Sequence, residues 1–472
     1  MMVEIDRARH GRTIGPPRRA VQPGWREGGP PEFGLVPGAP RTRIAPGSAG
    51  PGDGPRERPA GSGSESPVQV SKPPARRHVE GSAFRLGRGR ETILTRRILS
   101  LTPLDAILER IRARVAPVAA EAALIGHAVG LVLAAPLRVP ANVPTRALAA
   151  VDGWAVAADM VVGAGPGAPV FLAERPAAVE IGDAMPDGTD AVLPPEAVAE
   201  VAGFVEISAA AGAGEGVRPA GFDGEVGAVV LAAGRRLTPL AAAAARSVGL
   251  VEAVVRRPYV RILVIGDGLE PQDVTGRLIA DLVVARGAEL DRPAALADDP
   301  AVIAGALAES VADLIITVGG SGVGTTDRTL DGIGLAAASE VLAHGIAIAP
   351  GETTALAMIG DAPVLVLPGR PDAALAGFLL VGLPLIDRLA GADPALPDLG
   401  LPLAGKVSSA LGMTELRFMA LENGQAVPLA ASGLPLGRLG RADGYLVVPA
   451  RSEGFPVGAL AGIYRLPGGR SW

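Results

Sequence analysis

The stretch Asp313-Leu-Ile-Ile-Thr-Val318, followed at once by Gly319-Gly-Ser-Gly-Val-Gly-Thr-Thr-Asp327, joins a short apolar run to a glycine-rich loop. The apolar run is typical of a buried strand. The glycines allow backbone N–H groups to approach a phosphate with no Cβ in the way, and the hydroxyl groups add further donors. Asp327 stands where a helix could begin or a divalent cation could bind. The stretch therefore favours a phosphorylated ligand, although a glycine-rich turn can also simply end a strand.

Strand and helix patterns alternate around this stretch from residue 259 onward. In order, they predict a strand at 260–265, helices at 275–286 and 300–311, the strand 313–318, strands near 345–349 and at 364–367, and a helix at 372–390. Such alternation is typical of a parallel sheet with helices on both faces. The sequence therefore predicts a multi-domain α/β protein whose central domain has three layers.

Three of the predicted strands end in polar or glycine-containing loops. Gly266-Asp267 follows the first strand, the glycine-rich loop follows the second, and Pro368-Gly369-Arg370-Pro371 follows the third. In open α/β sheets, ligands bind outside the carboxyl ends of the strands. We therefore expect the three loops to meet at one ligand site, which favours the phosphate interpretation over that of an ordinary turn.

Composition excludes several classes of protein and site. The 472 residues are enough for about three domains of roughly 150 residues each. The chain has no Cys, which excludes disulfides, thiolate metal sites and Cys nucleophiles, and its four His residues are far apart in sequence. Gly, Arg, Asp or Pro interrupts every apolar run before the roughly 18 residues that a membrane helix needs. We therefore expect a soluble protein with no membrane partner.

Charge and turn composition divide the chain further. Residues 1–98 carry twice as many basic as acidic residues and are dense in Pro, Gly, Ser and Arg, which predicts a disordered tail. Scattered Arg without interleaved aromatic residues is more typical of a solvated linker than of a nucleic-acid partner. The remaining divisions that we predict are a discontinuous helical linker domain at 99–137 and 231–258, a β-rich domain at 138–230, the α/β domain at 259–393 and a small β domain at 394–472.

Shorter patterns predict the elements of the flanking domains. Helices are expected from Leu104 to about residue 116, over 121–135 and over 237–248. Short strands are expected in the β-rich domain at 155–156, 170–172, 191–193 and 204–207, and in the last domain at 445–448.

Several motifs in order along the chain carry a family resemblance. They are Ala150-Val-Asp152-Gly-Trp-Ala-Val156, Pro186-Asp-Gly-Thr-Asp190-Ala-Val192 with Glu196, Arg218-Pro-Ala-Gly-Phe-Asp223, the glycine-rich loop, Pro350-Gly351, Leu367-Pro-Gly-Arg-Pro371 and Arg441-Ala-Asp-Gly444. Together, over roughly residues 100–470, they resemble the molybdopterin molybdenumtransferase family, of the bacterial MoeA and gephyrin E-domain type.

This resemblance implies an activity, cofactors and partners. The family inserts molybdate into adenylylated molybdopterin and releases AMP, with Mg²⁺ as helper, and its members are elongated dimers. A cytoplasmic homodimer is therefore expected here, with molybdopterin-AMP and molybdate as small-molecule substrates and a client molybdoenzyme as a further partner.

The resemblance also assigns roles to residues. It implies catalytic roles for Asp152, Glu196, Asp223, Asp267 and Arg370, and metal binding by Asp267 and Asp327. The implied molybdopterin-binding residues are Gly319, Gly320, Ser321, Gly322, Gly324, Pro350, Gly351, Pro368, Gly369 and Pro371. An Asp beside a Gly can also simply shape a turn, a reading we favour for Asp190 but not for Asp152 or Asp223.

Departures from the family pattern keep two hypotheses open. The family's PGKP turn is Pro350-Gly-Glu352-Thr353 here, so a lysine is exchanged for a carboxylate that would repel oxyanions. Arg277 and Arg370 could replace the lost charge, since guanidinium groups suit phosphate. The chain is then either a working molybdenumtransferase or a non-catalytic molybdopterin-binding or carrier protein; a nucleotide-hydrolysing protein of the wider fold would not explain the flanking β domains.

Overall fold

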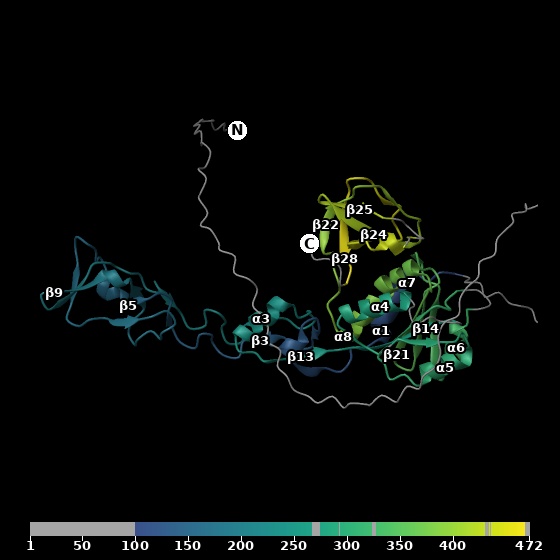
Figure 1. Cartoon of the computed structure of the whole chain (residues 1–472), viewed down its shortest axis with the longest axis horizontal. Helices are drawn as coiled ribbons and strands as arrows, with labels where there is room; N and C mark the ends of the chain where they lie inside the picture. The colour runs from purple at the N-terminus through teal and green to yellow at the C-terminus, as the bar shows by residue number, and fades with distance from the viewer. Residues whose placement is uncertain are drawn as a thin grey trace, which may run out of the picture. The chain divides into compact units, whose positions relative to one another are not determined.

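The computed structural model describes residues 100–266, 274–291, 293–322, 327–429, 434 and 436–467, shown in colour in Figure 1. All of them belong to one compact unit, Gly89–Trp472. The predicted tail at 1–98 and the predicted site residues Asp267 and Gly324 lie outside the described residues.

A seven-stranded sheet forms the centre of the α/β domain. Its order is β15-β14-β17-β21-β20-β18, and β16 also pairs with β14. The strands are β14 (Tyr259–Ile265), β15 (Glu289–Leu290), β16 (Ala294–Leu296), β17 (Leu314–Val318), β18 (Ser339–His344), β20 (Ala355–Ile359) and β21 (Ala362–Leu367). Strands β15, β16, β14, β17 and β21 pair in parallel, whereas β20 and β18 are antiparallel. The predicted parallel strands are therefore confirmed, and the sequence missed the antiparallel ribbon.

Helices cover both faces of this sheet, so the domain has the three predicted layers. On one face lie α1 (Leu104–Arg114), α4 (Val274–Ala285), α7 (Pro371–Gly377), the π-helical turn η3 (Phe378–Gly382) and α8 (Leu383–Ala390). On the other face lie α5 (Pro300–Ala308) and α6 (Thr329–Leu335) (Figure 1). Alternate residues of β14 explain the arrangement, because Ile262 and Val264 enter the first core while Leu263 and Ile265 enter the second.

The helical run Pro371–Ala390 is long and apolar. Its mean hydropathy is 1.7, and by length and composition it could cross a membrane. However, 89% of the window is buried inside the protein, where the helix fills the core beneath the sheet. The burial accounts for the apolar composition. Gly391 ends the helix in a left-handed conformation at φ 66°.

The linker segments contain both strands and helices. The predicted helix over 121–135 is wrong: the segment forms β1 (Glu121–Leu124), the single turn α2 (Ile125–Ala128) and β2 (Val132–Leu133). Both strands pair with β13 (Glu252–Arg256), a distant partner that a local pattern does not reveal. The predicted helix at 237–248 is confirmed as α3 (Pro239–Ser247), whose N-cap Thr238 accepts a hydrogen bond from the Ala241 N–H at 3.1 Å.

Short strands make up the region after residue 137. They are β3 (Leu137–Arg138), β4 (Leu148–Ala149), β5 (Gly153–Val156), β6 (Val170–Leu172), β7 (Ala177–Val179), β8 (Ala191–Leu193), β9 (Val198–Val201), β10 (Phe204–Ile207), β11 (Val217–Arg218) and β12 (Val229–Leu231). Two three-stranded sheets, β7-β5-β8 and β6-β10-β9, enclose a common apolar core. The four strands predicted there are all present.

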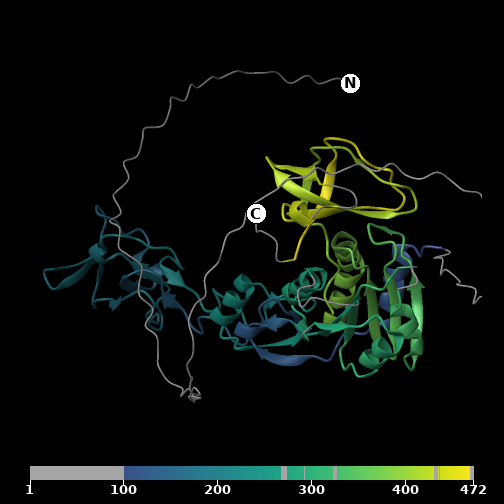
Figure 2. The same cartoon turned by 45° about the vertical axis from the view of Figure 1, so that its right-hand side comes forward.

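The C-terminal residues form a second large sheet, yellow in Figure 2. Its order is β19-β24-β26-β28-β22, and its strands are β19 (Ile348–Ala349), β22 (Leu399–Pro402), β24 (Thr414–Glu422), β25 (Gln425–Pro428), β26 (Gly444–Val448) and β28 (Leu460–Arg465). The strand predicted near 345–349 thus belongs to this sheet and not to the central one. Ile348 pairs in parallel with Thr414, so distant pairing again decides the partner.

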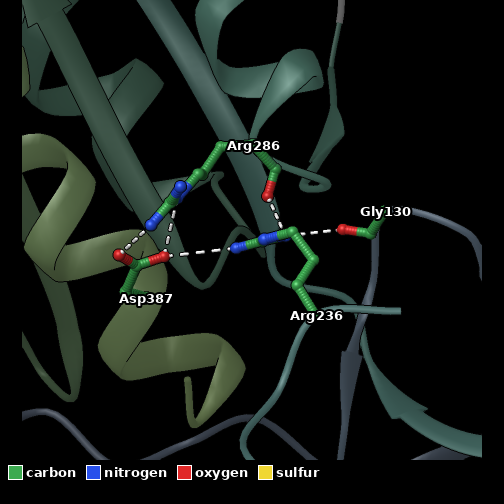
Figure 3. A network of polar contacts seen from close by, with 4 residues as sticks. All are labelled: Gly130, Arg236, Arg286 and Asp387. Atoms are coloured by element: carbon green, nitrogen blue, oxygen red, sulfur yellow. Dashed lines mark hydrogen bonds and ion pairs between the residues drawn. The ribbon is translucent and has the colours of Figure 1, made fainter. Parts of the chain in front are cut away.

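A buried ionic network ties the linker to the α/β domain (Figure 3). Asp387 of α8 accepts hydrogen bonds from Arg286 at 2.8 and 2.6 Å and from Arg236 at 3.3 Å. Arg236 also donates to the carbonyl oxygens of Gly130 at 2.5 Å and of Arg286 at 2.6 Å. Burial and the nearby Arg286 charge lower the pKa of Arg236 to about 10, so both guanidinium groups are charged at neutral pH.

Candidate functional site

The carboxyl ends of three parallel strands meet, as the sequence predicted. Val318 of β17 pairs with Val264 of β14 and with Leu367 of β21. Directly after these residues, the Gly319 N–H donates a hydrogen bond to the Leu367 carbonyl at 2.9 Å. The loops that follow β17 and β21 are therefore side by side at this edge of the sheet.

Gly319 and Gly320 belong to a close-packed loop. A residue with a side chain at either position would strain the backbone. Their φ angles are 100° and 64°, in the left-handed region that favours glycine. A Cβ would lie 2.6 Å from the Ile265 carbonyl oxygen at Gly319, and 2.2 Å from the Thr329 hydroxyl oxygen at Gly320. The buried Thr329 hydroxyl donates to the Gly319 carbonyl at 3.1 Å. The loop backbone is thus fixed against the end of β14 and the start of α6.

Ser321 connects this loop to the 350–354 turn. The Ser321 side chain is buried, and its hydroxyl oxygen lies 3.0 Å from that of Thr353. Gly351 in the turn has φ 115°, and a Cβ there would lie 3.0 Å from the Ala373 carbonyl oxygen of α7. The turn is therefore held between the glycine loop and the first turn of α7.

The loop after β21 places a cation at the same edge. Arg370 donates to both carboxylate oxygens of Asp372, at 3.2 and 3.1 Å. The Arg370 side chain is 64% exposed while that of Asp372 is 7% exposed, so the buried carboxylate orients an accessible guanidinium. Neighbouring Gly369 is exposed, and its carbonyl accepts a hydrogen bond from the Thr275 hydroxyl at 3.1 Å.

The Asp327 carboxylate lies beside the backbone of the glycine loop at Gly322. A Cβ on Gly322 would lie 2.5 Å from a carboxylate oxygen of Asp327. In the part of the chain that the structure describes, no group of three His, Cys, Asp or Glu side chains gathers as a metal site. Mg²⁺ beside phosphates commonly uses one or two carboxylates, so a single carboxylate at the loop fits such an ion.

The predicted residues of the β-rich region lie elsewhere and contact their own neighbours. Asp152 accepts a hydrogen bond from the Ile181 N–H at 2.8 Å, and Asp223 pairs with Arg218. Glu196 lies in the short helical turn η2 (Pro195–Ala197), whose Pro195 carbonyl accepts from the Trp154 indole at 3.0 Å. These hydrogen bonds and this ion pair therefore all lie within residues 143–223.

The predicted site residues therefore fall into two groups. The structure brings together Gly319, Gly320, Ser321, Gly322, Asp327, Pro350, Gly351, Pro368, Gly369, Arg370 and Pro371. Asp152, Glu196 and Asp223 form the other group. The Asp190 carboxylate accepts a hydrogen bond from the Ala158 N–H at 2.7 Å, so it joins two segments that are 32 residues apart in sequence.

Sequence reasoning missed three threonines whose hydroxyl groups contact the loops of the site. Thr275, Thr329 and Thr353 each place a hydroxyl group against one of the site loops. Their nearness to Asp267, Asp327 and Glu352 in the sequence was the only signal, and it did not show which loop each hydroxyl would contact.

The site described above is distinct from a cavity of about 910 Å³. Leu108 of α1, Leu383 and Arg388 of α8, and Tyr445 of β26 line that cavity. The cavity lining also includes Leu379, eight residues after Pro371, so the cavity begins about 12 Å along the helical run from the candidate site. None of the predicted site residues that the structure describes lines it.

Comparison with known proteins gives a consistent family match. The MoeA N-terminal region, comprising domains I and II, matches residues 102–249, and a molybdopterin-binding domain family matches residues 261–388. Molybdopterin molybdenumtransferase 2 of Mycobacterium tuberculosis is 30% identical over 368 residues, covering 68% of this chain and 89% of the relative. The Haemophilus influenzae molybdopterin molybdenumtransferase is 33% identical over 281 residues, covering 53% and 68%.

A solved structure agrees with these sequence matches. The molybdopterin biosynthesis MoeA protein of Pyrococcus horikoshii is 28% identical, with a TM-score of 0.66. The likeness covers 79% of this chain and 100% of that one. Outside residues 1–99, the sequence and the fold of this chain are therefore similar to those of these proteins.

Proposed function

The chain belongs to the MoeA family of molybdopterin molybdenumtransferases, enzymes of molybdenum cofactor biosynthesis, and we propose that it inserts molybdate into adenylylated molybdopterin with release of AMP. The substrates would bind at the carboxyl edge of the central sheet. The family match over most of the described chain does not favour the carrier hypothesis. We place the protein in the cytoplasm.

The fixed glycine loop carries this proposal. Gly319 and Gly320 have positive φ angles, and their neighbours leave no space for a Cβ. A backbone held in this way can present N–H groups to an anion without reorganising when the ligand arrives. The terminal phosphate of molybdopterin is such an anion, and the exposed Gly369 would let it approach the backbone closely.

Charged side chains around the loop would serve the cleavage of the phosphoanhydride. Insertion forms two bonds from molybdenum to the dithiolene sulfurs, and molybdate gives up two oxo ligands as water with protons from the thiols and the solvent. Cleavage of the phosphoanhydride takes up one water oxygen and separates the pterin phosphate from AMP, so negative charge grows on the leaving oxygens. The exposed Arg370 guanidinium, oriented by Asp372, would stabilise that charge. Asp327, together with Asp267, would hold Mg²⁺, which neutralises phosphate oxygens when bound.

The second group of residues supports a site shared between two copies. Asp152 and Asp223 have polar partners within their own module, and Glu196 lies in η2 of the same module. In a two-fold symmetric dimer, the β-rich module of one copy could face the sheet edge of the other. We propose that these three carboxylates complete the cleft of the partner copy and orient the pterin and molybdate there.

Release of AMP tests the proposed reaction. Purified full-length protein would be incubated with adenylylated molybdopterin, molybdate and Mg²⁺, and AMP would be quantified by chromatography. We expect AMP formation that depends on molybdate and is lost when Mg²⁺ is chelated. Equal AMP with and without molybdate would contradict molybdate insertion, and no AMP at all would contradict turnover.

A further inference from the structure

Glu352 places a negative charge inside the turn that borders the glycine loop. One of its carboxylate oxygens accepts a hydrogen bond from the Gly351 N–H at 3.1 Å. The Gly351 backbone is buried and has φ 115°, whereas the Glu352 side chain belongs to an exposed residue. A carboxylate that accepts from a backbone N–H is a charge-assisted contact, the same kind that a bound oxyanion makes.

The contact between Glu352 and the Gly351 N–H lies next to the candidate site. Thr353, the next residue, holds the turn to Ser321 of the glycine loop at 3.0 Å. On its other side, Gly351 lies against the Ala373 carbonyl in the first turn of α7. An anion that approached the Gly351 N–H would therefore lie beside the glycine loop that is proposed to bind the pterin phosphate.

We propose that Glu352 is a specificity-determining residue that acts as an internal anion: it occupies the Gly351 N–H and keeps free oxyanions out of the 350–354 turn. This inference rests on the proposed function, because it concerns the cleft assigned to the pterin substrate. Small dianions such as molybdate or inorganic phosphate must displace the carboxylate before they bind at the turn. The glycine loop itself stays open to the phosphate of the larger substrate.

Other charged groups lie on neighbouring loops at this sheet edge. The exposed Arg370 is held by Asp372 through two hydrogen bonds, and the Asp327 carboxylate lies beside Gly322 on the glycine loop. Removing one negative charge a few ångströms from a dianion should tighten binding about five- to tenfold in a partly solvated cleft.

Three variants of the full-length protein test this inference. Glu352→Gln removes the charge but keeps an acceptor for the Gly351 N–H, and Glu352→Ala removes both. Glu309→Gln is the matched control, because Glu309 is an exposed residue at the end of α5, after which the chain enters β17 from its amino end. The affinity for sodium molybdate and for inorganic phosphate would be measured by calorimetry, and thermal melting would check folding.

The inference predicts tighter binding of both ions by Glu352→Gln, at least equally tight binding by Glu352→Ala, and no change for Glu309→Gln. The ratio between Glu352→Gln and wild type should shrink at high salt, since screening weakens a charge effect. Affinities of Glu352→Gln equal to wild type would overturn the inference.

A parallel AMP-release assay separates this inference from the proposed function. Tighter molybdate binding by Glu352→Gln with no AMP release from any protein would refute the reaction and leave the role of Glu352 standing. AMP release with unchanged molybdate affinity would refute the role of Glu352 and leave the reaction standing.

Discussion

Arg286 and Asp387 form a bidentate pair, with two hydrogen bonds of 2.8 and 2.6 Å that join the end of α4 to α8. Arg236 donates to the same carboxylate and to two backbone carbonyls, so three segments distant in sequence converge on Asp387. The Asp387 side chain is only 12% exposed. One carboxylate therefore compensates two largely buried cations.

Asp387→Asn should destabilise the fold, because it leaves two guanidinium groups without their counter-charge. We expect the free energy of unfolding to fall by about 3 kcal/mol, which is typical of a broken buried ion pair, and the shift of the urea midpoint would measure it. A loss below about 1 kcal/mol would show that the network is not a structural link.

The control is Glu340→Gln, which breaks the Arg114–Glu340 pair, whose side chains are about half exposed. Solvent screens such exposed pairs, so they contribute little to stability. Arg114 lowers the pKa of Glu340 through a hydrogen bond and its charge. Any stabilisation is therefore present at neutral pH and lost in acid as Glu340 is protonated, so the variant and wild type should converge as pH falls.

Gly320→Ala should destabilise the α/β domain although it adds a single methyl group. The new Cβ would lie 2.2 Å from the Thr329 hydroxyl and would force an alanine to φ 64°. The left-handed conformation costs about 1–2 kcal/mol, and disturbing the buried Thr329 hydrogen bond adds about 1–3 kcal/mol.

Gly334→Ala is the matched control for that substitution. Gly334 lies in α6, and a Cβ there meets no atom within 4 Å. Alanine should stabilise the helix by roughly 0.5–1 kcal/mol. Equal stability changes at the two positions, measured by denaturant unfolding, would contradict the description of the loop as strained for any other residue.

Arg370→Ala should slow AMP release far more than it affects folding. The Arg370 side chain is 64% exposed, and thermal melting would measure what its loss costs the fold. Loss of a cation at the leaving phosphate should lower the rate by roughly 100-fold. Arg114→Ala, which breaks the exposed Arg114–Glu340 pair, is the control; an unchanged rate in Arg370→Ala would remove this residue from the mechanism.

A shared site predicts complementation between inactive copies. Asp223→Ala and Arg370→Ala proteins should each be nearly inactive alone. In a mixture allowed to exchange subunits, half of the dimers would hold one intact site, which gives about a quarter of the wild-type rate. AMP release by the mixture that equals the mean of the two variants would mean that each copy acts alone.

Local sequence patterns predicted the central domain well. The strands β14, β17 and β21 and the helices α4, α5 and α7–α8 lie close to their expected positions, because a buried parallel strand and an apolar helix each leave a continuous local signal. The strand predicted near 345–349 is present as β19, but its place in the central sheet was wrong, and the helix predicted over 121–135 was wrong, for the opposite reason. Their conformation is set by pairing with residues 414–415 and 252–256, far along the chain.

The same limit applies to the candidate site. Adjacent strand ends predicted that the loops after Val318 and Leu367 would meet, and they do. Sequence could not show that Glu352 contacts the Gly351 N–H or that Thr329 fills the space beside Gly320, since both depend on side-chain placement in folded loops. The roles of Asp152, Glu196 and Asp223 remain predictions.

Binding of adenylylated molybdopterin to Gly369→Asp and Gly369→Ala tests the phosphate cradle most directly. Gly369 is exposed, and a Cβ there would meet only the Gly319 Cα, at 3.8 Å, so both variants should melt like wild type. A carboxylate at this position should repel the substrate phosphates and lower affinity at least tenfold, whereas alanine should change it little. Wild-type affinity in a folded Gly369→Asp protein would contradict the assignment of this sheet edge as the binding site.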